Sequence, residues 1–186
     1  MRSGRFSSLF WSANPRWVEG RRLITAGFLH SGLWHIGLNM LALWWLGQQL
    51  EPLLGRVKFA VVYMTSLVAG SLGVLIASPH DLTVGASGAI FGLLGALVFY
   101  GRRTGSSAVH SQAMYYAVTA FIFGLLFPMT DNFTHAGGFV GGWLTARVLD
   151  PQKPERINHM LIALGCLLLS VLSIIASVLV ALRENG

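Results

Sequence analysis

The sequence predicts an all-α, polytopic membrane protein with six transmembrane helices, and three observations indicate this fold. The 186 residues are 54% hydrophobic and only 11% charged, which exceeds the apolar content that one soluble domain needs to bury. The apolar residues gather in stretches long enough to cross a bilayer, and short breaks rich in Gly, Pro and charged residues separate them. Small residues recur within these stretches without alternation of polar and apolar side chains, so helices are favoured over barrel strands.

Each predicted helix is an apolar stretch with recognisable ends. The expected spans are residues 33–50, 59–78, 82–101, 113–129, 134–149 and 157–182. The breaks between them are Glu51-Pro52 with Gly55, Ser78-Pro79, the run 101–105, Pro128 with Asp131-Asn132, and Pro151 with Pro154. The fifth span is short, so we expect its polar N-terminal end to line a water-filled cavity.

The basic residues indicate how the helices are oriented. The net charge of +6 does not predict nucleic-acid binding, because the 13 Lys and Arg form short clusters between the spans and no basic stripe. These clusters are Arg56 and Lys58, Arg102 and Arg103, and Arg147, Lys153 and Arg156. The positive-inside rule places the three connections that hold them in the cytoplasm. The first, third and fifth helices therefore begin at the outer side.

The segment before the first span conflicts with this orientation. It would lie outside, yet it contains five arginines, which the positive-inside rule disfavours. One explanation is that residues 6–18, with Phe10, Trp11 and Trp17, lie flat on the outer leaflet. The other, which we expect, is that the natural chain carries a further hydrophobic helix upstream.

Polar groups are costly inside a bilayer, so those within the spans are candidates for a functional site. His35 and Asn39 are four residues apart and share one face of the first helix. Ser87 lies near the start of the third helix, where free backbone N–H groups and the helix dipole favour a developing oxyanion. His135 lies at the start of the fifth helix. At about 1.5 Å per residue, Ser87 and His135 are roughly 22 and 18 Å from the cytoplasmic ends of their helices, so they can share one membrane layer.

Each of these residues also has a simpler structural interpretation. A serine among glycines, as in Gly85-Ala86-Ser87-Gly88, is more often a packing surface, and a lone histidine is more often a structural hydrogen-bonding group. Gly138 and Gly142 form a small-xxx-small face next to His135, which predicts close packing of the fifth helix against the third. A serine and a histidine in register favour catalysis more than either residue does alone.

Together these motifs resemble the rhomboid family of intramembrane serine proteases. The shared features are His35-x-x-x-Asn39, Gly85-x-Ser87-Gly88, and His135 followed by Gly138 and Gly142. The resemblance implies that Ser87 is the nucleophile and His135 its general base, with His35, Asn39 and the Ser87 backbone N–H holding the oxyanion. It implies an outer segment (1–32), a five-helix catalytic core (33–149), and a linker with an extra C-terminal transmembrane helix (150–186).

The sequence departs from the family pattern in two places. The family's tyrosine one turn after the serine, on which the catalytic imidazole stacks, is Phe91 in this chain, so stacking is retained without the hydroxyl. The family's Trp-Arg pair in the outer loop reads Arg21-Arg22.

We therefore expect a serine endopeptidase that cleaves transmembrane proteins near the outer face of the membrane. No Asp or Glu lies within a span, so a Ser–His dyad is expected, with Asp131 as the nearest alternative partner for His135. The expected partners are transmembrane protein substrates and the lipid bilayer, with no nucleic acid, metal or cofactor. The expected location is a bacterial plasma membrane, with the site open to the non-cytoplasmic side.

Two other classes of function stay open. A non-catalytic membrane protein could use the same scaffold to bind or retain transmembrane clients, although such a protein has no need of both Ser87 and His135. A transporter is the other class, but no inverted repeat supports it.

Overall fold

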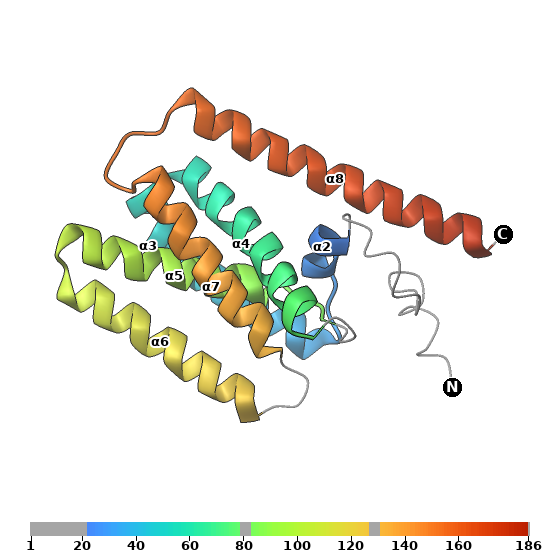
Figure 1. Ribbon diagram of the computed structural model, residues 1–186, viewed down its shortest axis with the longest axis horizontal. Helices are drawn as coiled ribbons and strands as arrows, with labels where there is room; N and C mark the ends of the chain where they lie inside the picture. Colours follow the sequence, from blue (N-terminus) through green and yellow to red (C-terminus); the bar gives the residue numbers. More distant parts are fainter. Residues whose placement is uncertain (1–21, 79–82, 127–130, 186) are drawn as a thin grey trace.

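The computed structural model describes residues 22–78, 83–126 and 131–185, and within these ranges it contains helices and no strands (Figure 1). The predicted all-α fold is therefore confirmed. The expectation about residues 6–18 lies outside the described residues. The elements are α2 (Arg22–Thr25), the 3-10 helix η1 (Ala26–Phe28), α3 (Leu33–Leu54), α4 (Arg56–Ala77), α5 (Ser87–Thr104), α6 (Ser107–Leu126), α7 (Asn132–Leu149) and α8 (Ile157–Asn185).

The predicted spans correspond to α3 through α8, and the differences lie at the helix ends. α3 continues through Glu51 and Pro52, the first part of the predicted break, because a proline so near the C-terminal end disrupts only the last turn. The helix ends at Leu54, and Gly55, the other predicted break residue, is its C-cap with a φ of 82°. α6 begins at Ser107, before the predicted residue 113, since hydropathy marks the membrane core and a helix can extend beyond it.

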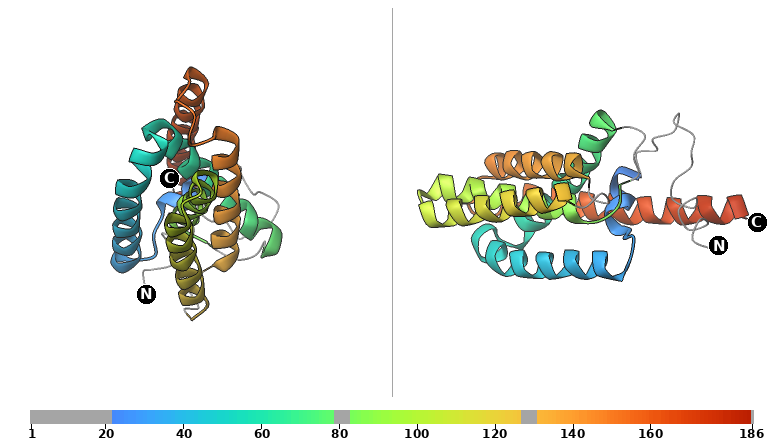
Figure 2. Two further views of the ribbon diagram at one scale, coloured as in Figure 1. Left: turned by 90° about the vertical axis from the view of Figure 1, so that its left-hand side faces the viewer. Right: turned by 90° about the horizontal axis from the view of Figure 1, so that it is seen from below.

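The long helices alternate in direction, so the bundle has two distinct ends. α3, α5 and α7 begin at one end, called here the site end. The α3–α4, α5–α6 and α7–α8 connections lie at the other end, called the basic end (Figure 1). α5 is central, because its residues from Gly88 to Val98 are all buried. Both views in Figure 2 show α3 and α7 on opposite sides of α5, so the start of α5 lies between them.

The outer surface of the bundle is apolar, as expected of helices that face lipid. Among the described helices, α4, α6 and the Ile157–Val180 part of α8 are long and apolar enough to cross a membrane. Leu125 of α6 and Leu168 and Leu172 of α8 are each more than half exposed. α3, α5 and α7 contain more polar residues, and these three helices hold the candidate site residues.

Glycines let α7 pack closely between α5 and α4. A Cβ atom at Gly138 would overlap the Gly88 backbone of α5, and Gly142 repeats this contact one turn later. On the other face of α7, a Cβ atom at Gly137 would lie 2.6 Å from the Ala69 carbonyl oxygen of α4. The backbones are therefore in direct contact, and this contact sets the position of α7 relative to α5.

We expect Gly138→Val to destabilise the folded protein by about 1–3 kcal/mol or more, because the branched side chain must push α7 away from α5. Thermal unfolding in detergent measures the loss. Gly165→Val in α8 is the matched control, since a Cβ atom there meets nothing within 4 Å. Equal melting temperatures for the two variants would contradict the packing argument.

A buried lysine holds the α7–α8 connection against α4 at the basic end. Lys58 is 1% exposed, and its Nζ donates to the carbonyl oxygens of Asp150, at 2.9 Å, and Lys153. Glu155 completes this contact by accepting hydrogen bonds from the backbone N–H groups of Val57 at 2.9 Å and Lys58 at 3.3 Å. A carboxylate at the N-terminal end of α4 also interacts favourably with the helix dipole.

Asp150 adds ion pairs to the same connection. Its Oδ2 lies 3.5 Å from Arg103 Nη2 and 3.4 Å from Lys153 Nζ. Burial raises the pKa of Asp150, but the Gln152 backbone N–H and the Arg103 and Lys153 cations outweigh it and hold this pKa below its ordinary value. Asp150 is therefore ionised at neutral pH.

We expect Lys58→Met to destabilise the protein by about 1–3 kcal/mol, because the substitution leaves two carbonyl oxygens at a buried position without their charged donor. Lys153→Met is the control, since that side chain is 61% exposed and interacts with Asp150 from the surface. Thermal unfolding of both variants checks this expectation. A loss in Lys153→Met as large as that in Lys58→Met would show that the buried amine has no special role.

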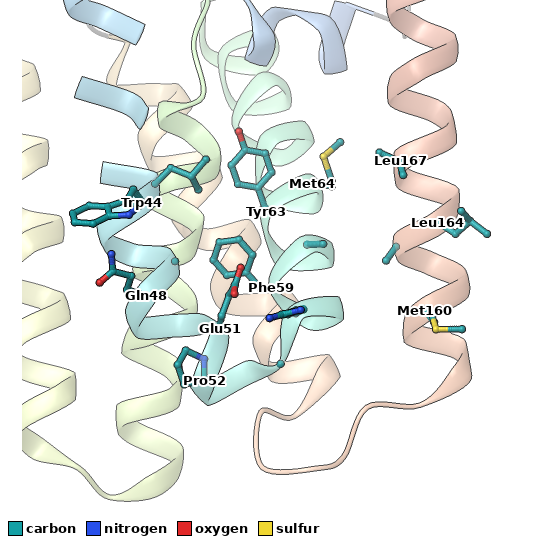
Figure 3. A pocket seen from close by; sticks show the side chains of 16 residues that line it. Trp44, Gln48, Glu51, Pro52, Phe59, Tyr63, Met64, Met160, Leu164 and Leu167 are labelled. Carbon is teal, nitrogen blue, oxygen red and sulfur yellow. The ribbon is translucent and has the colours of Figure 1, made fainter. Parts of the chain in front are cut away.

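α8 lies at the periphery of the bundle (Figure 1). It contacts α4 and α2, while an open groove of about 1070 Å³ separates it from α3 (Figure 3). Phe59 of α4 lies at the floor of this groove, and Trp44 of α3 and Leu164 of α8 lie on its two sides. The lining is mostly apolar, with Glu51 and Arg56 both present at the basic end.

Candidate functional site

Ser87 is the first residue of α5 and lies half-buried at the site end. The first backbone N–H groups of a helix have no intrahelical acceptor, and no side-chain hydrogen bond caps those of α5. The chain enters the helix through Gly85, whose φ of 120° is accessible to glycine without strain. The Gly85 N–H donates to the Ala26 carbonyl oxygen at 2.9 Å, which ties this loop to η1.

His135 lies in the first turn of α7 and is only 4% exposed. Its ring stacks on the Phe91 ring of α5, with ring centres 4.1 Å apart and 10° between the planes. Phe91 is one turn after Ser87 and shares its helix face. The structure thus brings Ser87, Phe91 and His135 together where α5 and α7 begin.

The hydrogen bond of His135 defines the tautomer of its neutral ring. His135 Nδ1 lies 3.3 Å from Asn132 Oδ1. Because an amide oxygen can only accept, Nδ1 carries the proton and Nε2 is left unprotonated. An imidazole in this tautomer can take a proton at Nε2 from a neighbouring hydroxyl.

Asp131, the alternative partner for His135, has a different role. Its Oδ1 accepts from the Phe133 N–H at 2.8 Å and the Thr134 N–H at 3.3 Å, so the side chain caps α7. The oxygen at His135 Nδ1 comes from Asn132 rather than from Asp131, whose second carboxylate oxygen, Oδ2, is buried without a hydrogen-bond partner among the described residues.

His35 and Asn39 approach the start of α5 from α3. A Cβ atom at Gly85 would lie 2.6 Å from His35 Nε2 and 3.7 Å from Asn39 Nδ2, so both side chains face the loop that leads to Ser87. Asn39 Nδ2 donates one hydrogen to the His35 carbonyl oxygen at 2.9 Å, which leaves its second N–H available.

Ser31 orients the His35 ring. The Ser31 backbone N–H donates to His35 Nδ1 at 3.4 Å, and the Ser31 hydroxyl lies 3.0 Å from the same atom. A backbone N–H cannot accept, so Nδ1 of the neutral ring is unprotonated and Nε2 carries the hydrogen. The His35 Nε2–H therefore faces Gly85 as a donor.

Sequence reasoning missed Asn132, Ser31 and a role for His30. The His30 ring packs edge-on against His35, with ring centres 5.1 Å apart, and its two nitrogens are buried without a hydrogen-bond partner. Asn132 precedes His135 by three residues and Ser31 precedes His35 by four. These spacings, which correspond to one helical turn, were the only sequence signal for a contact with the two histidines. Polar residues one turn apart are common at helix starts, so the signal is weak.

Within the described residues, no hydrogen bond joins the Ser87 hydroxyl to the His135 ring. Hydrogen bonds between catalytic groups are often long or poorly aligned in the absence of substrate. The parts present are a hydroxyl, an imidazole with a free Nε2, two side-chain N–H donors and an uncapped helix start. This set of groups can carry out acyl transfer.

The sequence pattern of the Rhomboid domain matches residues 18–152, which is most of the chain. The chain belongs to the rhomboid family. It is 34% identical over 148 residues to the rhomboid protease GluP of Bacillus subtilis, an alignment that covers 78% of this chain and 29% of GluP. It is 36% identical over 135 residues to RHOMBOID-like protein 4 of Arabidopsis thaliana, covering 70% of this chain and 34% of the relative.

Among these relatives, GluP is named a protease, whereas another is named inactive. The inactive RHOMBOID-like protein 8 of Arabidopsis thaliana is 32% identical over 137 residues, covering 71% of this chain and 39% of that protein. The chain thus spans about a third of the length of each of these three relatives. Family membership establishes a polytopic helical membrane protein, and the question of activity turns on the residues at the site end.

Proposed function

We propose that this rhomboid is an intramembrane serine endopeptidase in which Ser87 is the nucleophile and His135 is its general base. The observation that supports this most strongly is the His135 ring stacked on Phe91, one turn from Ser87, with Asn132 bound to Nδ1. The stacking and the hydrogen bond keep the free Nε2 on the face of α5 that carries the serine.

The proposed reaction proceeds through an acyl-enzyme. Ser87 Oγ attacks the carbonyl carbon of a substrate peptide bond while its proton passes to His135 Nε2. The C–N bond breaks as His135 gives this proton to the leaving amine, and the acyl group stays on Ser87. Water then attacks the ester, gives its proton to His135, and releases the acyl product as the proton returns to Ser87.

The negative charge on the tetrahedral intermediate needs donors that are already in place. The His35 Nε2–H and the free Asn39 N–H face the loop before Ser87, and the Ser87 backbone N–H lies at the uncapped start of α5. We assign these three donors to the oxyanion. The positive end of the α5 dipole adds to their effect.

The substrate class and orientation follow from the position of the site. The site end is opposite the basic end, where Arg56 begins α4 and where Arg102 and Arg147 lie in the last turns of α5 and α7. The positive-inside rule therefore favours the non-cytoplasmic side for the site end. We assign the protein to a bacterial plasma membrane and its substrates to transmembrane proteins. A substrate helix must unwind there, because a helical carbonyl is occupied by its own backbone hydrogen bond.

Cleavage of a transmembrane substrate in liposomes tests this proposal. The substrate carries a Gly-Ser pair near the outer end of its helix and a fluorophore at each terminus, and mass spectrometry locates the cut. We expect one main cleavage site near the outer membrane surface. Absence of any product while the substrate co-purifies with the protein would contradict the proposal.

That same result would support the second candidate function, which is binding or retention of transmembrane clients without cleavage. The observation that favours this alternative is the similarity to a relative named inactive. A binding protein would retain the substrate equally in the parent and in Ser87→Ala, because neither would consume it.

We expect Asn132→Ala to lower the cleavage rate by roughly 10- to 100-fold, because the His135 ring loses the acceptor that fixes its orientation. Asn132→Asp keeps an acceptor and is expected to retain most of the activity. Asn158→Ala, at the exposed start of α8, is the control. Equal rates for Asn132→Ala and the parent would show that packing on Phe91 alone orients the ring.

A further inference from the structure

A second cleft lies near the basic end, between α5, α6 and α7, with a volume of about 380 Å³. Val98, Met114, Phe139 and Val140 give it an apolar lining. Along α5, the helical rise from Ser87 is roughly 16 Å to Val98 and roughly 22 Å to Arg102, the two residues of this helix that line the cleft. The cleft is therefore separate from Ser87, while its inner end at Phe139 lies one helical turn after His135.

The mouth of this cleft is cationic. Arg102 lines it and is exposed, and no acidic residue is among the described residues of the lining. Trp143 also lines it, and the Arg147 Cζ atom lies 5.7 Å from the centre of the Trp143 ring. The nearby carboxylate, Asp150, pairs with Arg103 and Lys153.

One further polar group lies in the cleft. His110 lies at the start of α6, with its Nδ1 3.4 Å from the Val98 carbonyl oxygen. Because a carbonyl oxygen can only accept, Nδ1 is the donor in this hydrogen bond, and Nε2 takes no part in it. The cleft thus combines an arginine, an imidazole and an indole around an apolar interior. Tryptophan and arginine are both typical of the head-group level of a membrane.

We propose that this cleft binds one anionic phospholipid, with the head group at Arg102 and an acyl chain along Val98, Phe139 and Val140. Basic pockets between transmembrane helices on the cytoplasmic side recognise anionic lipid head groups. Arg147 adds a second positive charge beside Trp143. Charge complementarity distinguishes this cleft from the larger groove between α3, α4 and α8, where Glu51 accompanies Arg56.

Native mass spectrometry of the full chain in mild detergent tests this inference with equimolar dioleoyl phosphatidylglycerol and dioleoyl phosphatidylcholine. We expect the parent to retain phosphatidylglycerol preferentially. Arg102→Gln is expected to lower this retention roughly fivefold, since one arginine near the surface contributes about that factor. Arg102→Lys keeps the charge and should retain most of the preference.

Two more variants separate the cleft from general surface charge. Arg56→Gln, at the same end of the bundle, should leave the preference unchanged. Val140→Trp fills the cleft without changing charge, and because Val140 is 54% exposed the fold can accommodate it. We expect this variant also to lose phosphatidylglycerol.

The inference fails if the parent retains both lipids equally, if Arg102→Gln binds like the parent, or if Arg56→Gln loses as much lipid as Arg102→Gln. Retention by Val140→Trp equal to the parent's would likewise overturn the assignment of the acyl chain. Lipid retention is measured without substrate, so this result is independent of whether the protein is a protease.

Discussion

Replacing Ser87 with alanine is expected to lower peptide-bond cleavage by roughly 10⁴-fold or more, and His135→Ala should have an effect of similar size. In the proposed mechanism the hydroxyl attacks the substrate carbonyl, and a hydroxyl is a weak nucleophile unless a base such as the imidazole removes its proton. Because the two residues act in one step, their losses should not add. The double variant should be about as slow as either single variant.

The matched controls are Ser107→Ala and His159→Ala, which alter exposed or half-exposed residues at the basic end. Thermal unfolding of all variants checks that the fold is retained. Substrate binding should also persist in Ser87→Ala. If Ser87→Ala cleaved a transmembrane substrate at a rate close to that of the parent, the assignment of the nucleophile would be wrong.

Loss of either side-chain oxyanion donor is the second large effect. We expect His35→Ala and Asn39→Ala each to slow cleavage by roughly 10²- to 10³-fold, the usual cost of removing one such donor. The loss should fall on kcat rather than KM, because these donors interact most strongly with charge that develops in the transition state.

Asn39→Asp gives a sharper test than alanine. It keeps the size of the side chain but replaces the N–H donor with a carboxylate oxygen, which would repel the oxyanion. Activity should therefore be at least as low as in Asn39→Ala. Unchanged turnover in both alanine variants would assign His35 and Asn39 to the packing of α3 against the loop at Gly85.

The sequence predicted the number and order of the long helices well, because each is a long apolar run. It did less well at their ends. Pro52 was read as a break, although near the end of a helix it disrupts only the final turn. The start of α6 was missed because four of the residues from Ser107 to Gln112 are polar. The length of an apolar run reflects the thickness of the membrane core, and a helix can extend beyond it.

The candidate site was predictable only in part. Ser87, His135, His35 and Asn39 could be named because polar residues are rare in apolar spans. Asn132 and Ser31 could not be named as site residues from the sequence. They lie at helix starts, where asparagine and serine commonly cap the helix and indicate no function. Lys58 was interpreted only as an orientation signal, whereas its amine is buried against carbonyl groups of a connection more than ninety residues away.

The most direct test of the central claim is whether Ser87 is an activated nucleophile. Purified protein is treated with a fluorophosphonate, which reacts with activated serine hydroxyls, and the labelled residue is identified by mass spectrometry. The proposal predicts a single labelled serine, Ser87, with labelling abolished in Ser87→Ala and strongly reduced in His135→Ala. Labelling at another serine, or equal labelling with and without His135, would contradict it.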